Sequence, residues 1–234
     1  MPTLHVVRRH QQTADVVCGP TALAMQLSAF GLDLSPAEVA GGAAAFRRDG
    51  DAGLTTQELA AFCLSLGLEV ELHSFDGRVL DYAWTGMDQT DLETQLAALC
   101  AHLRRVRPFA DTRRRYAEAY LALVRAGGVL RIATHVRRGL LLELLTRGPV
   151  GAGVLDNVLS GTGKRDASGS PDPLEGDVGT HSVLLVGVDD DGFLLADPAL
   201  PTTSSLQHRD TETLLAAITA AQIDDDNSVL LVTR

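Results

Sequence analysis

Hydrophobic positions recur along the chain with two spacings, one typical of helices and one typical of strands. Helical spacing, with capping and stop residues at its ends, predicts helices over residues 20–30, 36–45, 56–66, 91–104, 112–126, 137–147 and 211–221. Alternating or continuous apolar runs predict strands over residues 3–8, 69–74, 129–134, 150–155, 182–188, 193–196 and 228–233. Helices dominate the first half and strands the second, which favours an α+β fold with a helical half and a sheet half.

Local signals set several of these boundaries. Ser35-Pro-Ala-Glu38 and Thr55-Thr-Gln-Glu58 are typical capping boxes at helix starts. Proline suits the first helical position because its φ is fixed and it lacks an N–H, so Pro20 is expected there. Cys18 is then expected at, or just before, a helix N-terminus. Asp189-Asp-Asp-Gly192 between two apolar runs predicts a β-hairpin turn.

Composition excludes several classes of protein. Hydrophobic residues make up 45% of the 234 residues, enough to build a packed core. The formal net charge of −10 argues against a general nucleic-acid binder. The three cysteines are odd in number and not at metal-ligand spacing, so neither a disulfide scaffold, a zinc site nor a cofactor is predicted. No apolar run approaches the roughly 20 residues of a membrane span, and no signal peptide is recognisable, so we expect a cytoplasmic protein.

Four polar residues carry the candidate chemistry. A thiol at a helix N-terminus has a lowered pKa, and a nearby imidazolium lowers it further, which makes Cys18 a candidate nucleophile and His181 its partner. Asp197 could fix the tautomer of His181, although the hairpin register is not determined by the sequence. Gln12 lies on the segment that enters Cys18, and its amide could join the Cys18 N–H in holding an oxyanion.

The motifs resemble those of the papain-like cysteine peptidase superfamily. Gln12-x5-Cys18-Gly-x-x-x-Leu-x-Met25 and His181-x-Val-Leu-Leu-Val-Gly187, followed by Asp197-Pro198, are most similar to cysteine peptidase family 39, the double-glycine leader peptidases and their stand-alone relatives. The resemblance implies a Cys18 nucleophile, a His181 general base and acid, an orienting Asp197 and an oxyanion donor in Gln12. It implies a papain-like fold, in which a helical lobe headed by the nucleophile helix packs against an antiparallel sheet lobe.

The same resemblance suggests how the chain is organised. It covers roughly residues 6–75 and 129–200, so we expect one domain over 1–234 with a helical insertion at 76–128. Residues 156–180, rich in Gly, Asp, Ser and Pro, form a long loop before the histidine, and such loops are often functional.

Three functions remain open at this point. The first is a cysteine hydrolase acting on a peptide or other amide bond through an acyl-enzyme. The second is an acyltransferase or transpeptidase that uses the same residues on an amide or thioester substrate, because an amine can replace water as the acceptor. The third is a non-catalytic binding module. Neither a nucleic-acid nor a membrane partner is expected.

The other reactive side chains have simpler interpretations. Cys63 and Cys100 lie in apolar helical patterns typical of core residues. Gln11 competes with Gln12 for the oxyanion role, and the spacing favours Gln12. A cluster of arginines is either a solvated helical face or a site beside the predicted substrate cleft that binds an acidic group, such as a substrate carboxylate or phosphate. Its members are Arg104, Arg105, Arg107, Arg113, Arg114 and Arg115.

Overall fold

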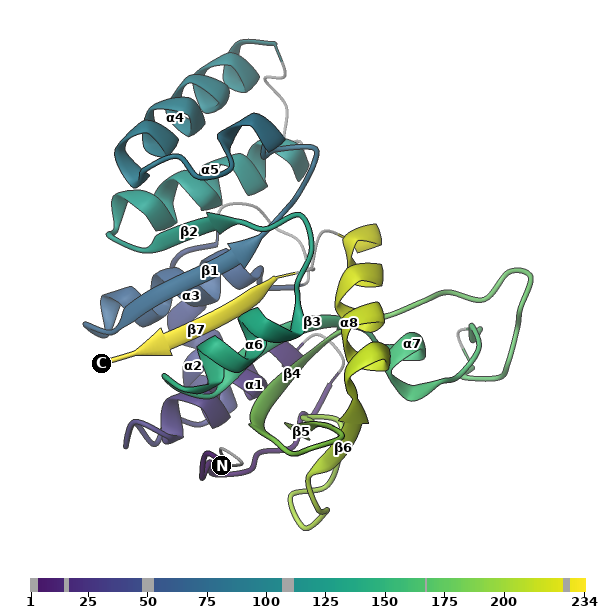
Figure 1. Cartoon of the computed structure of the whole chain (residues 1–234). Helices are drawn as coiled ribbons and strands as arrows, with labels where there is room; N and C mark the ends of the chain where they lie inside the picture. The colour runs from purple at the N-terminus through teal and green to yellow at the C-terminus, as the bar shows by residue number, and fades with distance from the viewer. Residues whose placement is uncertain (1–3, 15–16, 48–52, 107–111, 167, 225–227) are drawn as a thin grey trace.

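A sheet of seven strands, in the order β2-β1-β7-β3-β4-β5-β6, is the centre of the structure, a computed structural model (Figure 1). The residues described are 4–14, 17–47, 53–106, 112–166, 168–224 and 228–234. The strands are β1 (Glu69–Ser74), β2 (Val129–Ile132), β3 (Val150–Leu155), β4 (Thr180–Val188), β5 (Gly192–Ala196), β6 (Gln207–Asp210) and β7 (Val229–Thr233). β1 and β2 pair in parallel, and the other neighbouring strands pair antiparallel.

Helices cover the sheet, which confirms the predicted α+β class. The α-helices are α1 (Cys18–Ser28), α2 (Pro36–Ala44), α3 (Thr56–Ser65), α4 (Gln89–Val106), α5 (Thr112–Arg125), α6 (Arg138–Leu145), α7 (Asp156–Ser160) and α8 (Thr211–Ala220). Short 3-10 helices η2 (Tyr82–Trp84) and η3 (Ala221–Asp224) accompany them. Both predicted capping boxes form, at the starts of α2 and α3. No helix in the described ranges is long and apolar enough to cross a membrane.

The alternation of side chains on β7 divides its apolar residues between the two larger hydrophobic clusters of the described residues. On β7, Leu230 and Val232 join the core built with α1 to α5, whereas Val229 and Leu231 join the core built with α6 and α8. Figure 1 shows α6 and α8 on one face of the sheet and α1 to α3 on the other. Each fully buried Leu or Val contributes roughly 1.5–3 kcal/mol by leaving water.

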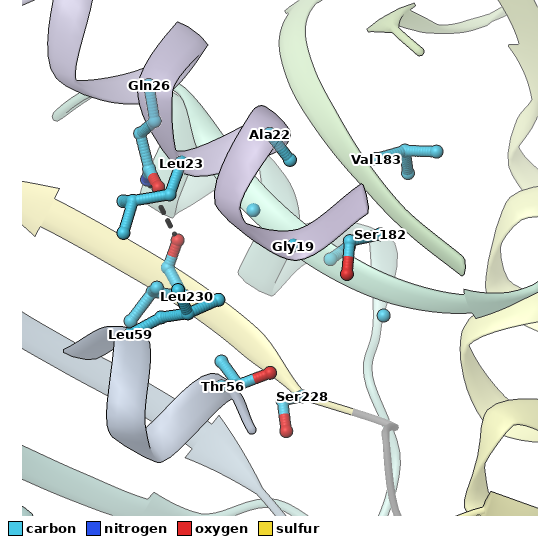
Figure 2. A pocket seen from close by; sticks show the side chains of 13 residues that line it. Gly19, Ala22, Leu23, Gln26, Thr56, Leu59, Ser182, Val183, Ser228 and Leu230 are labelled. Carbon is cyan, nitrogen blue, oxygen red and sulfur yellow. Dashed lines mark hydrogen bonds between the residues drawn. The ribbon is translucent and has the colours of Figure 1, made fainter. Parts of the chain in front are cut away.

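A buried glutamine fixes helix α1 to the sheet. Gln26 is 1% exposed, and its Nε2 donates hydrogen bonds to the carbonyls of Pro149 at 2.8 Å and Leu230 at 3.1 Å. Figure 2 shows the second of these bonds crossing from α1 to β7. Buried carbonyls without partners would destabilise the fold, so this side chain sets where α1 lies on the sheet.

The structure corrects several predicted elements. No strand covers the described part of residues 3–8, where Leu4 forms an isolated bridge to Gly187 and the His5 N–H bonds to Val186. Pro20 is the third residue of α1 and not the first, because the helix already begins at Cys18. β6 and α7 were not predicted, since their sequences, Gln-His-Arg-Asp and Asp-Asn-Val-Leu-Ser, are short and mostly polar.

The helical segment between β1 and β2 is attached through α5. α5 packs against α4, α3 and β2, and places the segment at the β2 edge of the sheet (Figure 1). One contact here is an ion pair inside the protein. Arg115 Nη2 lies 3.1 Å from Glu58 Oε2, and the two side chains are 8% and 1% exposed. Glu58 also closes the α3 capping box by accepting the Thr55 N–H. Its carboxylate therefore stabilises both the start of α3 and the buried contact with Arg115.

Replacing Arg115 should therefore destabilise the protein strongly. Arg115→Ala leaves the buried Glu58 carboxylate without its cation, and we expect a loss of about 3–5 kcal/mol in the free energy of unfolding. Arg104→Ala is the matched control, because Arg104 pairs with Glu118 but its own side chain is 59% exposed, and the expected loss is below about 1 kcal/mol. Denaturant unfolding followed by circular dichroism measures both. Equal losses in the two variants would contradict the interpretation.

Candidate active site

The candidate nucleophile is the first residue of α1. The N-cap, Val17, makes no side-chain capping bond, and the first turn of α1 contains no acidic residue. The N–H groups at this end therefore have no side-chain acceptor from the cap, and the positive end of the helix dipole acts on Cys18. The Cys18 side chain is partly buried and is a free thiol.

The β4–β5 hairpin brings the predicted histidine and carboxylate together. His181 is the second residue of β4, and Asp197 directly follows the last residue of β5. A register shift between Leu185 and Gly187 aligns the two ends, with Leu184 opposite Ala196. His181 Nε2 lies 2.8 Å from Asp197 Oδ1, and both side chains are 8% exposed. Asp197 Oδ1 also accepts the Ala199 N–H at 2.8 Å, so the carboxylate is held from two sides.

The histidine also contacts the thiol. Because Nε2 bonds to Asp197, Nδ1 is the ring nitrogen left for Cys18. Burial alone would lower the pKa of His181, but hydrogen bonds and charges from Asp197 and Cys18 raise it to about 10. Burial likewise would raise the pKa of Cys18, yet the hydrogen bond and charge of His181, with hydrogen bonds from Ser182, hold it below its usual value. Burial would also raise the pKa of Asp197, and His181, Ala199 and Arg209 keep it low.

These opposite shifts favour one charge state. A lowered thiol pKa and a raised imidazole pKa both favour the state in which the proton resides on His181 and the sulfur is a thiolate. Asp197 is ionised beside them. A thiol, an imidazole and a carboxylate in this order can attack a carbonyl carbon through the sulfur and donate a proton to a leaving group from the imidazole.

Gln12 lies beside the end of the hairpin. Its backbone N–H donates to the Pro198 carbonyl at 2.8 Å, which ties the segment before Cys18 to the residue after Asp197. The side-chain oxygen of Gln12 is buried and has no hydrogen-bond partner among the described residues. Gln11, the competing candidate, is exposed.

Sequence reasoning missed Ser182, which follows the histidine. Ser182 is half-buried and lies against the first turn of α1, where a Cβ added to Gly19 would be 3.6 Å from its Oγ. It also lines a pocket of about 30 Å³, room for little more than a methyl group. Figure 2 shows Ser182 beside Gly19 and, further along the pocket, Thr56 and Ser228.

The remaining candidates stay outside this site. Burial raises the pKa of Cys63 to about 12, and Cys100 is 1% exposed, so both are core residues as predicted. In the arginine cluster, Arg115 pairs with Glu58 and Arg104 with Glu118, whereas Arg107 lies outside the described residues. The segment within 156–180 that follows α7 projects from the body of the protein (Figure 1). No group of three or more His, Cys, Asp or Glu residues among the described positions could hold a metal ion.

Solved structures similar to this chain include the following two. A Bacillus anthracis protein described as a C39-like peptidase has a TM-score of 0.49 and 13% identity, over 100% of this chain and 98% of its own. The peptidase domain of Streptococcus ComA, a bifunctional ABC transporter involved in quorum sensing, has a TM-score of 0.46 and 10% identity, over 97% of this chain and 98% of its own. No family model and no curated protein matches.

Removing the carboxylate should change the titration of both partners. In Asp197→Asn the His181 pKa falls from its raised value, because a negative neighbour is lost. The imidazolium then supports the thiolate less, so the pH midpoint of Cys18 alkylation by iodoacetamide moves upward. The matched control is Asp189→Asn at the turn of the same hairpin, where Asp189 pairs with the exposed His208. We expect no change in this control, and an unchanged midpoint in Asp197→Asn would contradict the proposed coupling.

Proposed function

We propose that this protein is a papain-like cysteine hydrolase, related to cysteine peptidase family 39, which cleaves a peptide or other amide bond through an acyl-enzyme on Cys18. The observation that supports it most is the position of His181 between two partners. Its Nε2 is 2.8 Å from Asp197 Oδ1, and its other ring nitrogen faces the Cys18 thiol at the start of α1. A buried histidine with a carboxylate on one side and a thiol on the other is the arrangement that activates a cysteine nucleophile.

In this mechanism the bond changes occur in two stages. The Cys18 thiolate attacks the substrate carbonyl carbon, and the charge moves to the carbonyl oxygen. When the C–N bond breaks, His181 gives its proton to the leaving amine, and a thioester remains on Cys18. His181, now neutral, takes a proton from water as the water attacks the thioester. The acid product leaves, and the thiolate–imidazolium pair is restored.

Two donors are assigned to the oxyanion of this reaction. The Cys18 N–H is one, since it belongs to the first turn of a helix without a side-chain cap. The Gln12 side-chain amide is the other. The hydrogen bond from the Gln12 backbone N–H to the Pro198 carbonyl supports this role, because it holds the segment before Cys18 beside the end of the hairpin.

Acyl transfer would use the same residues, since only the acceptor differs. Product analysis with and without added amines distinguishes the two reactions, and we retain hydrolysis as the main proposal. The non-catalytic interpretation would be favoured by a buried thiol remote from the histidine. The partly buried Cys18 and its contact with His181 argue against that interpretation.

Loss of the nucleophile should abolish turnover. Cys18→Ala is expected to lose all hydrolysis of a peptide and amide panel, together with the transient mass increase of an acyl adduct. Cys63→Ala removes a buried thiol whose pKa is too high for reaction, and activity should remain close to that of the unmodified protein. Mass spectrometry of rapidly quenched mixtures measures both. Turnover by Cys18→Ala would refute the proposed function.

Gln12→Ala should separate oxyanion stabilisation from thiol activation. We expect turnover to fall by about 10²–10³, the typical cost of one oxyanion donor, while the pH profile of Cys18 alkylation stays the same. Gln11→Ala is the control, because Gln11 is the exposed neighbour. A large change in alkylation by Gln12→Ala, or equal losses of turnover in both variants, would exclude the oxyanion role.

A further inference from the structure

Ser182, near the start of β4, has a backbone N–H that does not bond to β3. Ser182 lies opposite Gly153, and Gly153 donates its N–H to Ser228 on the far side of β3 at 2.9 Å. Facing residues of an antiparallel pair either exchange both hydrogen bonds or exchange none, so the Ser182–Gly153 pair is of the second kind. The Ser182 N–H therefore points away from β3, toward the side on which β5 lies further along the strand.

β5 does not reach this N–H. Its pairing with β4 begins at Leu184, opposite Ala196, and the same register continued would place Pro198 opposite Ser182. The Pro198 carbonyl, which would accept the Ser182 N–H in that register, instead accepts the N–H of Gln12 at 2.8 Å, and proline has no N–H to complete the pair. The N–H of Ser182 thus faces the space occupied by the start of α1.

The Ser182 hydroxyl points to the same place. Side chains alternate along a strand, and Leu184, on the same face as Ser182, packs with Met25 of α1. A Cβ added to Gly19 would lie 3.6 Å from Ser182 Oγ, and Figure 2 shows the Ser182 side chain next to Gly19. Both donors of Ser182 therefore meet the first turn of α1, where the Cys18 sulfur is located.

Few charged groups on the surrounding elements could act on the Cys18 sulfur in place of Ser182. His181 on β4 faces Cys18, and Asp197 after β5 acts through His181, with Arg209 more distant. α1 and β3 contain no charged residue. On α3, Glu58 is occupied by Arg115, and on the entering segment His10 has Arg8 and Asp33 as its charged neighbours.

We propose that Ser182 is a positioning residue that holds the Cys18 sulfur as a thiolate, using its side-chain hydroxyl and its backbone N–H as two donors. This proposal rests on the proposed function, because it concerns the same nucleophile. The lowered pKa of Cys18, to which hydrogen bonds from Ser182 contribute alongside His181, is in agreement with it.

Such donors have a specific consequence for reactivity. They stabilise the charged sulfur of the resting enzyme, and they lose much of this interaction when the charge moves to the substrate oxygen. Ser182 therefore increases the thiolate fraction at low pH, while it decreases the intrinsic nucleophilicity of each thiolate. Removal of the hydroxyl should give a pH profile that crosses that of the unmodified protein.

The test is the rate of Cys18 alkylation by iodoacetamide as a function of pH, in the unmodified protein, Ser182→Ala and Ser182→Thr. For Ser182→Ala we expect a rate about tenfold lower at mildly acidic pH, from the loss of one hydrogen bond to a charged group, and an equal or higher rate on the alkaline plateau. Ser182→Thr keeps the hydroxyl and should follow the unmodified protein. Ser228→Ala, which removes another hydroxyl of the same pocket, should leave the pH midpoint unchanged.

Two results would overturn the proposal. One is a Ser182→Ala profile identical to that of the unmodified protein. The other is a uniform loss at all pH values in both Ser182 variants, which a merely structural residue would produce. Failure of the proposed function looks different, because the unmodified protein itself would then titrate as an ordinary thiol.

Discussion

The candidate site depends on a difference in length between two paired strands. β4 begins at Thr180 and continues to Val188, whereas β5 ends at Ala196, opposite Leu184. Within the described residues, the β4–β5 pairing therefore stops at Leu184 and does not extend to His181 and Ser182. The start of α1 occupies that position, with Cys18 next to the unpaired end of the strand. If β5 continued by two more paired residues, its backbone would occupy the space where the thiol now meets His181.

The contact between the Cys18 thiol and His181 requires that α1 keep a fixed position on the sheet. Met25, Leu23 and Leu27 are at most 2% exposed, so the helix is enclosed by apolar neighbours. Apolar burial is strong but not directional, and it would tolerate a small sliding motion. Hydrogen bonds are directional, and the two that Gln26 donates to the Pro149 and Leu230 carbonyls fix the position of α1 along the sheet. The buried Gln26 side chain thus helps to hold the thiol at a constant distance from the imidazole.

Local signals predicted most of the fold, and long-range pairing accounts for the errors. The capping boxes at Ser35 and Thr55 were correctly read because the interacting groups are three residues apart. The run 3–8 has a strand pattern, but its described part pairs with β4 only through an isolated bridge from Leu4 to Gly187. The meeting of Cys18, His181 and Asp197 was expected from the residue types. The register of the hairpin, and with it the place of Ser182, depends on an irregularity near Leu185 that no local pattern encodes.

The position of β7 has a consequence for the synthesis of this protein. β7 comes late in the chain, yet it lies between β1 and β3 in the middle of the sheet (Figure 1). β1 and β3 are not neighbours, so residues 229–233 connect the two halves of the sheet. On a ribosome, the segment with Cys18 and the hairpin with His181 emerge long before this strand. Gln26 of α1 bonds to the Leu230 carbonyl of β7, so one of the two hydrogen bonds that place α1 on the sheet can form only after this strand has been made.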